Sequence, residues 1–126
     1  MSNVLVIQSS ILGAYSQSTK LLDTFSVEWK QKHPADNIVV RDLAADPLPV
    51  LDGEIIAALG GNGELNERQK AAAALSLKLI DEIKAADYVV VAVPMYNFGI
   101  PVQLKTWFDM ICRAGITFSY SETGPQ

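Results

Sequence analysis

Short apolar runs alternate with amphipathic stretches along this chain of 126 residues. Residues 4–8, 37–42 and 89–93 are rich in valine, leucine and isoleucine, which is typical of strands in a parallel sheet. Helical spacing of apolar residues, or a capping sequence, predicts helices over residues 17–32, from 66 to about 86, and over 100–113. This order predicts an α/β fold: a doubly wound parallel sheet in a three-layer α/β/α arrangement.

The remaining segments are predicted to be less regular. Residues 51–59 have room for a short helix, and the glycine-rich residues 60–63 predict a flexible break. Alternation over residues 116–120 predicts a short exposed strand, and residues 121–126 have the composition of a loop. We find no internal repeat and treat residues 1–126 as a single domain.

Residues 88–101 are the stretch around which the chain is organised. Their β-branched run predicts a strand buried on both faces, and Pro94 ends it because proline has no N–H to donate. A loop with two aromatic residues, an amide and a glycine follows, and Pro101 can begin the next helix. Open α/β sheets bind ligands at the carboxyl ends of their strands. The stretch therefore suggests a loop that holds a flavin.

The loop after the first strand is rich in hydroxyl groups. It matches neither the dinucleotide-binding glycine pattern nor a P-loop. The N–H groups at the start of the following helix favour a phosphate, and neutral hydroxyls would complete its hydrogen-bonding shell. The hydroxyl-bearing residues are Ser9, Ser10, Tyr15, Ser16 and Ser18, with Gln17 among them. The alternative is that Ser16 only caps the helix while the others are solvated, and this loop alone slightly favours that interpretation.

Residues 95–99 favour a ligand site over a simple helix cap. Their backbone groups could pair with the edge of a heteroaromatic ring while Tyr96 and Phe98 cover its faces. Asn97 could fix the turn or point at the ring edge. The alternative is a hydrophobic turn packed into the core or a subunit contact. Two such loops at adjacent strand ends favour a nucleotide site.

Composition narrows the possible partners. The formal charge of −4 argues against nucleic acid and anionic membranes, and no apolar run is long enough for a membrane helix. The N-terminus lacks the features of a signal peptide. The lone cysteine, Cys112, excludes an internal disulfide and fits a reducing cytoplasm, and a structural zinc site is not expected from one cysteine and one histidine.

Several short sequences together resemble a known family. They are Val4-Leu5-Val6-Ile7, Ser9-Ser10, Tyr15-Ser16-Gln17-Ser18, Arg41-Asp42-Leu43, Pro49-Val50-Leu51-Asp52-Gly53 and Pro94-Met95-Tyr96-Asn97-Phe98. Across its whole length the chain resembles the bacterial FMN-dependent NADH-azoreductases, also described as FMN-dependent NADH:quinone oxidoreductases, of flavodoxin-like fold. The resemblance implies that Ser10, Ser16, Gln17 and Ser18 bind the FMN phosphate and ribityl region. It also implies that Met95, Tyr96, Asn97 and Phe98 line the isoalloxazine.

The resemblance also implies a chemistry and an assembly. Family members are homodimers in which NADH reduces the flavin, and the flavin then reduces a quinone or azo compound in a ping-pong sequence. No catalytic side chain or metal is implied. Family members continue through further strands and a third flavin-contacting loop, so we expect this chain to be the N-terminal portion of the domain, with weak FMN binding on its own. The alternatives are a flavodoxin-type electron carrier and a non-enzymatic interaction module of the same fold.

Overall fold

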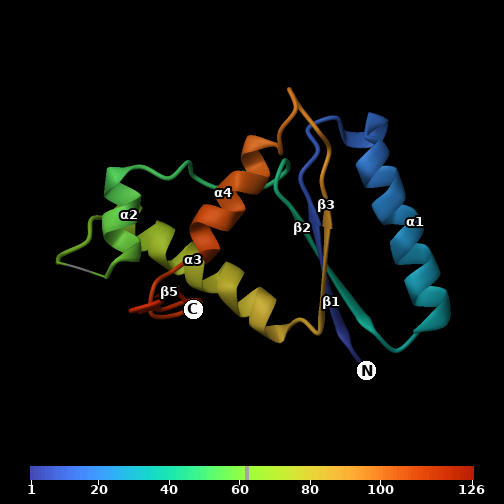
Figure 1. Ribbon diagram of the computed structural model, residues 1–126. Helices are drawn as coiled ribbons and strands as arrows, with labels where there is room; N and C mark the ends of the chain where they lie inside the picture. Colours follow the sequence, from blue (N-terminus) through green and yellow to red (C-terminus); the bar gives the residue numbers. More distant parts are fainter. Residues whose placement is uncertain (62) are drawn as a thin grey trace.

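The fold is known from a computed structural model that describes residues 1–61 and 63–126 (Figure 1). A central parallel sheet has the strand order β2-β1-β3, so β1 lies between its two partners. The predicted α/β class and β-α-β-α-β-α order are confirmed. The elements are β1 (Asn3–Gln8), the 3₁₀ turn η1 (Gly13–Tyr15), α1 (Gln17–Lys32), β2 (Asn37–Asp42), α2 (Gly53–Leu59), α3 (Glu67–Ala85), β3 (Tyr88–Ala92), α4 (Val102–Ile111), β4 (Tyr120–Ser121) and β5 (Gly124–Pro125).

The core lies on both faces of β1, whose alternate side chains point to opposite sides of the sheet. Leu5 and Ile7 pack against the layer formed by α2, α3 and α4, which supply Ile55, Leu79 and Leu104 to the same cluster. Val4 and Val6 pack against Leu22 of α1 on the other face. The four β1 residues are at most 2% exposed. This central strand therefore carries the first loop of the candidate site on a rigid base.

The two long helices begin where the sequence predicts them. The Ser16 side chain accepts a hydrogen bond from the Thr19 N–H at the start of α1, and Asn66 and Gln69 form a reciprocal capping box at the start of α3. Helical spacing alone does not place every leucine of α1 in the core, since Leu21 is 73% exposed. Its neighbour Leu22 packs in the core.

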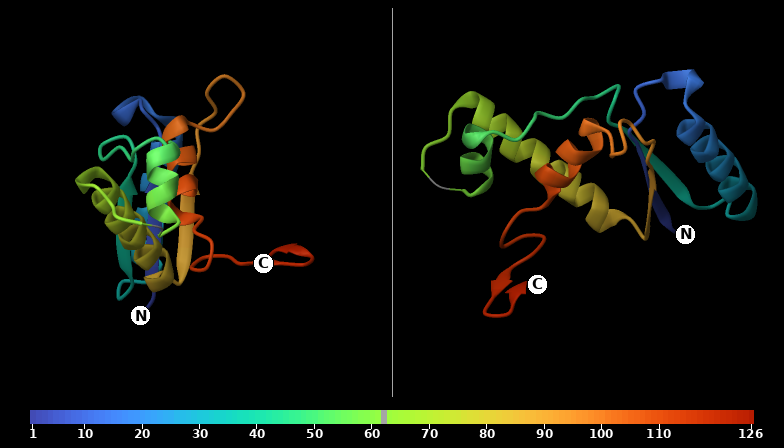
Figure 2. Two further views of the ribbon diagram at one scale, coloured as in Figure 1. Left: turned by 90° about the vertical axis from the view of Figure 1, so that its left-hand side faces the viewer. Right: turned by 45° about the horizontal axis from the view of Figure 1, so that its top comes forward.

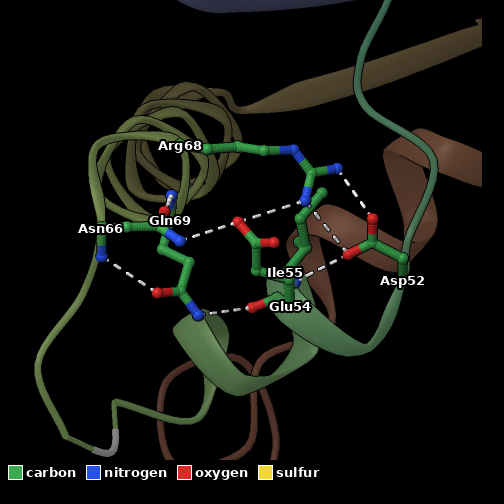
Figure 3. A network of polar contacts seen from close by, with 6 residues as sticks. All are labelled: Asp52, Glu54, Ile55, Asn66, Arg68 and Gln69. Atoms are coloured by element: carbon green, nitrogen blue, oxygen red, sulfur yellow. Dashed lines mark hydrogen bonds and ion pairs between the residues drawn. The ribbon is translucent and has the colours of Figure 1, made fainter.

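A polar network joins the start of α2 to the start of α3 (Figure 3). Arg68 forms ion pairs with Asp52 and Glu54, while Asp52 also caps α2 by accepting the Ile55 N–H. Asn66 donates to Glu54, and Gln69 donates to the Glu54 carbonyl. Hydrogen bonding by Arg68, together with the Ile55 N–H, lowers the pKa of Asp52, and the Asp52 carboxylate raises that of Arg68. The break predicted at residues 60–63 lies partly outside the described residues.

Strand β3 differs from the prediction of a strand buried on both faces. It spans Tyr88–Ala92, and Val93, which the prediction included, lies beyond it. Val89 is 44% exposed and Val93 46%. The reason is position: β3 pairs with β1 on one side and forms the edge of the sheet in the described part of the chain. Valine runs indicate a strand but do not show how many neighbours cover it.

The C-terminal segment also differs from the sequence prediction. Of the strand predicted over residues 116–120, only Tyr120 lies in a strand; residues 115–117 form a turn and Phe118 forms an isolated bridge with Ala114. The Thr117 hydroxyl holds this turn, because it accepts from the Arg113 N–H and donates to backbone carbonyls. The segment predicted as a loop contains β5, which pairs with β4 in a small antiparallel hairpin. Figure 2 shows this hairpin extending away from the sheet and its helices. Helix α4 is shorter than predicted, and exposed Cys112 lies directly after it.

Candidate functional site

The candidate site lies at the carboxyl ends of β1 and β3, the two adjacent strands that carry the loops singled out in the sequence. Gln8 and Ala92 are the last residue pair of the β1–β3 ladder, so both loops start side by side (Figure 1). Ser9 is fully buried and its hydroxyl donates to the Ala92 carbonyl at 2.8 Å. This hydrogen bond holds the first loop against the end of β3. The Ser9 hydroxyl proton is therefore not available to a ligand.

The serine loop, residues 9–18, reaches α1 through the single turn η1. Gly13 has φ of 56°, a left-handed conformation that glycine adopts without steric cost. Ser16 is 2% exposed, and its Oγ lies 3.1 Å from the Thr19 N and 3.0 Å from the Ser18 Oγ. Ser16 therefore caps α1, as the alternative without a phosphate site also predicts. The cap does not exclude a ligand, because the hydroxyl network also extends to Ser18.

The start of α1 offers hydrogen-bond donors. Among the described residues, the Gln17 and Ser18 backbone N–H groups have no protein acceptor, as expected in the first turn of a helix. The Gln17 side chain is exposed and that of Ser18 is half-buried. Neither residues 9–18 nor residues 93–101 include a charged side chain. An anion bound here would therefore be held by neutral donors and by the positive end of the helix dipole.

The ring loop, residues 93–101, is built around a tight turn. The Tyr96 N–H donates to the Gly99 carbonyl at 2.9 Å, and the Gly99 N–H donates back to the Tyr96 carbonyl at 3.1 Å. Between them, Asn97 and Phe98 have φ values of 52° and 65°. Two successive left-handed residues define a type I′ turn, which usually contains glycine or asparagine. Phenylalanine is strained there, and such strain is characteristic of functional loops.

The turn presents apolar side chains to solvent. Phe98 is 95% exposed and Met95 is 70% exposed, and the Asn97 side chain is exposed beside them. Large apolar groups held outward on a constrained loop are suited to contact a flat ligand or another subunit. Pro101, which is buried, precedes α4 as its N-terminal cap residue and fixes the far end of the loop.

Tyr96 joins the two loops. Its hydroxyl lies 2.9 Å from the Ser10 Oγ and accepts a hydrogen bond from the Ile11 N–H at 3.2 Å. Its polar end therefore points to the serine loop. Sequence reasoning placed both residues in one site but missed this contact. In the sequence, the signal was that Ser10 and Tyr96 each follow a predicted strand. The structure adds that these two strands end at the same position of the ladder.

Other notable features lie away from this site. An open groove of about 620 Å³ lies between α1 and β2, with Val27 and Val40 among its lining residues. Hydrogen bonding by the Ser2 N–H lowers the pKa of Asp36, which precedes β2 at the amino end of the sheet. Within residues 1–61 and 63–126, no helix has both the length and the hydropathy needed to span a membrane.

Comparison with known proteins identifies the family. A family model described as flavodoxin-like fold matches residues 2–126. The chain belongs to the flavodoxin-like fold family. Within this family, the chain is 85% identical to a Tolumonas auensis protein named FMN-dependent NADH:quinone oxidoreductase, covering 100% of this chain and 63% of that protein. It is 57% identical to Escherichia coli proteins of the same name, again over 100% of this chain and 63% of theirs.

Solved structures confirm the flavodoxin-like architecture. An azoreductase from Bacillus anthracis superposes with a TM-score of 0.90 at 33% identity, over 100% of this chain and 62% of that one. An FMN-dependent NADH-azoreductase from Bacillus anthracis, solved in complex with FMN, gives a TM-score of 0.87 at 27% identity over 99% and 62%. The resemblance inferred from the sequence is thereby confirmed. The chain spans just under two thirds of the length of these relatives.

Proposed function

We propose that this chain forms the phosphate-binding and ring-binding parts of an FMN site in an NADH-dependent oxidoreductase that reduces quinones and azo compounds. The observation that carries this proposal is the Ser10–Tyr96 contact of 2.9 Å, which makes the two loops one continuous surface. The names of the Tolumonas auensis and Escherichia coli relatives support FMN, NADH and quinone as ligands, and the azoreductase structures support azo acceptors.

The residues present fit FMN at both ends. A phosphate would be held by the Ser10, Ser16 and Ser18 hydroxyls, the Gln17 side chain and the free N–H groups of the first turn of α1. The isoalloxazine would lie against Met95, Tyr96, Asn97 and Phe98, where the exposed apolar groups supply contact area and the turn supplies backbone groups. Neither loop contains a carboxylate that would repel the phosphate.

FMN held by these residues would supply the hydride chemistry by which NADH reduces a quinone or azo acceptor in a ping-pong sequence. The residues of this chain would position the two ends of the cofactor. The N-cap of α1 would hold the phosphate end, and the type I′ turn would hold the ring end. The exposed Phe98 and Met95 would shield the ring from water and limit which flat acceptors can approach.

We regard residues 1–126 as the N-terminal portion of a flavodoxin-like domain whose sheet is completed by further strands beside β3. The complete protein would be a cytoplasmic homodimer, without nucleic acid or membrane partners. Exposed apolar side chains around the ring loop, including Phe98, Ile100 and Val102, support a subunit contact there.

The test compares two proteins: the 126-residue chain, and the same chain extended by the C-terminal third of the Tolumonas auensis relative. We expect the extended protein to bind FMN at one equivalent per chain and to oxidise NADH only when a quinone or azo acceptor is present. The 126-residue chain should bind FMN more weakly. Flavin binding without NADH turnover would favour an electron carrier, and an extended protein that binds no FMN would contradict the proposal.

A further inference from the structure

The contact between the two loops is a hydrogen-bond network of two hydroxyl groups and two backbone N–H groups. The Ser10 Oγ accepts from the Leu12 N–H at 3.2 Å and lies 2.9 Å from the Tyr96 hydroxyl oxygen. The Tyr96 oxygen accepts from the Ile11 N–H at 3.2 Å. Ser10 is 6% exposed and Tyr96 is half-buried, so these groups have little water to replace a missing partner.

Two proton arrangements satisfy this geometry. When Tyr96 donates to Ser10, the serine oxygen accepts two hydrogen bonds and its own proton is free to donate elsewhere. When Ser10 donates instead, the tyrosine proton is the free one. Among the described residues, neither hydroxyl donates to a further acceptor. An anion beside Ser10 would select the first arrangement, because only that arrangement gives it a serine donor.

We propose that Tyr96, although it lies in the ring loop, is a positioning residue for the phosphate end of the cofactor, because its hydroxyl turns the Ser10 proton outward as a donor. This inference rests on the proposed FMN site. A hydroxyl that already accepts hydrogen bonds is polarised and becomes a stronger donor. The Tyr96 hydroxyl also fixes the Ile11 N–H, so the loop backbone is placed by the same group.

The inference predicts a selective defect. Tyr96→Phe keeps the aromatic ring and removes only the hydroxyl, so the ring contact should survive while the phosphate contact weakens. The readout is the ratio of the dissociation constants of riboflavin and FMN, measured by flavin fluorescence on the 126-residue chain. Where that chain binds neither flavin, the same titrations are made on the extended protein. We expect FMN affinity to fall roughly five- to tenfold and riboflavin affinity to change less than about twofold.

Two further variants sharpen the test. Ser10→Ala should abolish the same share of the FMN preference, and Tyr96→Phe should add nothing to it in a Ser10→Ala background. Tyr88→Phe is the matched control, because Tyr88 lies at the opposite end of β3 and packs on Trp29. It should leave the ratio unchanged. Amide hydrogen exchange without flavin should show faster exchange at Ile11 in Tyr96→Phe, but not in Tyr88→Phe.

The outcomes separate the two proposals. Equal loss of FMN and riboflavin affinity in Tyr96→Phe, or additive losses in the double variant, would overturn the role of the hydroxyl and leave the FMN site standing. A parent protein that binds neither flavin even in extended form would overturn the proposed function and this inference with it. A parent that binds both flavins equally would show that the serine loop does not recognise the phosphate, and would also overturn the inference.

Discussion

At the scale of single residues, the ring loop combines strain with exposure. Phe98 has φ of 65° and is 95% exposed, so its side chain contributes little burial while its backbone bears a left-handed conformation. For a residue with a Cβ this conformation costs about 1–2 kcal/mol, and glycine avoids that cost but loses about 0.5–1 kcal/mol of chain entropy on folding. The strain is understandable if the exposed ring is needed for a ligand or a subunit contact.

Phe98→Gly should therefore stabilise the flavin-free chain by about 0.5–1 kcal/mol. The measurement is the free energy of unfolding from urea denaturation. Phe98→Ala serves as the control, because it removes the ring but keeps a Cβ in the left-handed region, and it should bring no such gain. In the extended protein Phe98→Gly should weaken flavin binding, so the two effects would have opposite signs. A destabilised Phe98→Gly chain would show that the ring already packs against the protein.

Ser16 has two roles that different substitutions separate. Its hydroxyl caps α1, so Ser16→Ala should cost about 1 kcal/mol of stability, whereas Ser16→Gly should cost only a few tenths. Both variants remove the same hydroxyl from the proposed phosphate site and should weaken FMN binding alike. Thermal unfolding and flavin titration on the same samples check this. If Ser16→Gly kept the parent affinity for FMN, Ser16 would be a cap and no more.

At the scale of elements, local sequence predicts structure well where the deciding contacts are local. The start of α1 and the capping box of α3 follow from residues within four positions of each helix start. The exposure of β3 could not be predicted from local sequence, because it depends on which strands lie beside it. The turn after α4 could not be predicted either, because it depends on hydrogen bonds between the Thr117 hydroxyl and the backbone. The two site loops were predicted together, but their Ser10–Tyr96 contact depends on the β1–β3 register.

The junction of α2 and α3 should respond to acid. The pKa of Asp52 is lowered from its ordinary value of 3.8, chiefly by hydrogen bonding to Arg68, so the folded state binds this proton less readily than the unfolded chain. Its contribution to stability is thus fully present above about pH 4 and is lost as pH falls through the lowered pKa. Asp52→Asn should be less stable than the parent at pH 7, and urea unfolding should show this difference shrinking below pH 4. A pH-independent difference would mean that Arg68 contributes through packing alone.

The ion pair between Arg41 of β2 and Glu82 of α3 ties a sheet edge to its covering helix. Both side chains are largely shielded, at 13% and 18% exposed. Removing one partner leaves a shielded charge, so Glu82→Ala should cost about 2–3 kcal/mol. The double variant Arg41→Met/Glu82→Leu should recover most of that loss. Urea denaturation of the parent, both single variants and the pair would measure the coupling, and a double variant no better than Glu82→Ala would contradict this account.

At the scale of the whole molecule, the sheet has an apolar edge strand. Val89 is 44% exposed on β3, and β3 has a strand partner only on the β1 side within the described residues. An exposed apolar edge is unusual in a finished sheet, because it invites further pairing. The flavodoxin-like relatives are longer than this chain, which covers 63% of the Tolumonas auensis protein. The edge is consistent with a sheet that continues beyond β3 in such a protein.

The same substitution should therefore have different costs in two chains. Val89→Lys places a long, flexible charge at a half-exposed position of the 126-residue chain, where it should change the free energy of unfolding by less than about 0.5 kcal/mol. In the extended protein a neighbouring strand would cover this position, and the buried lysine should cost more than about 2 kcal/mol. Val40→Lys on β2, which is 53% exposed at the other edge, is the control and should have equal effects in both proteins. Equal effects of Val89→Lys in both would mean that the added segment does not pair with β3, and the site would then have to be complete without it.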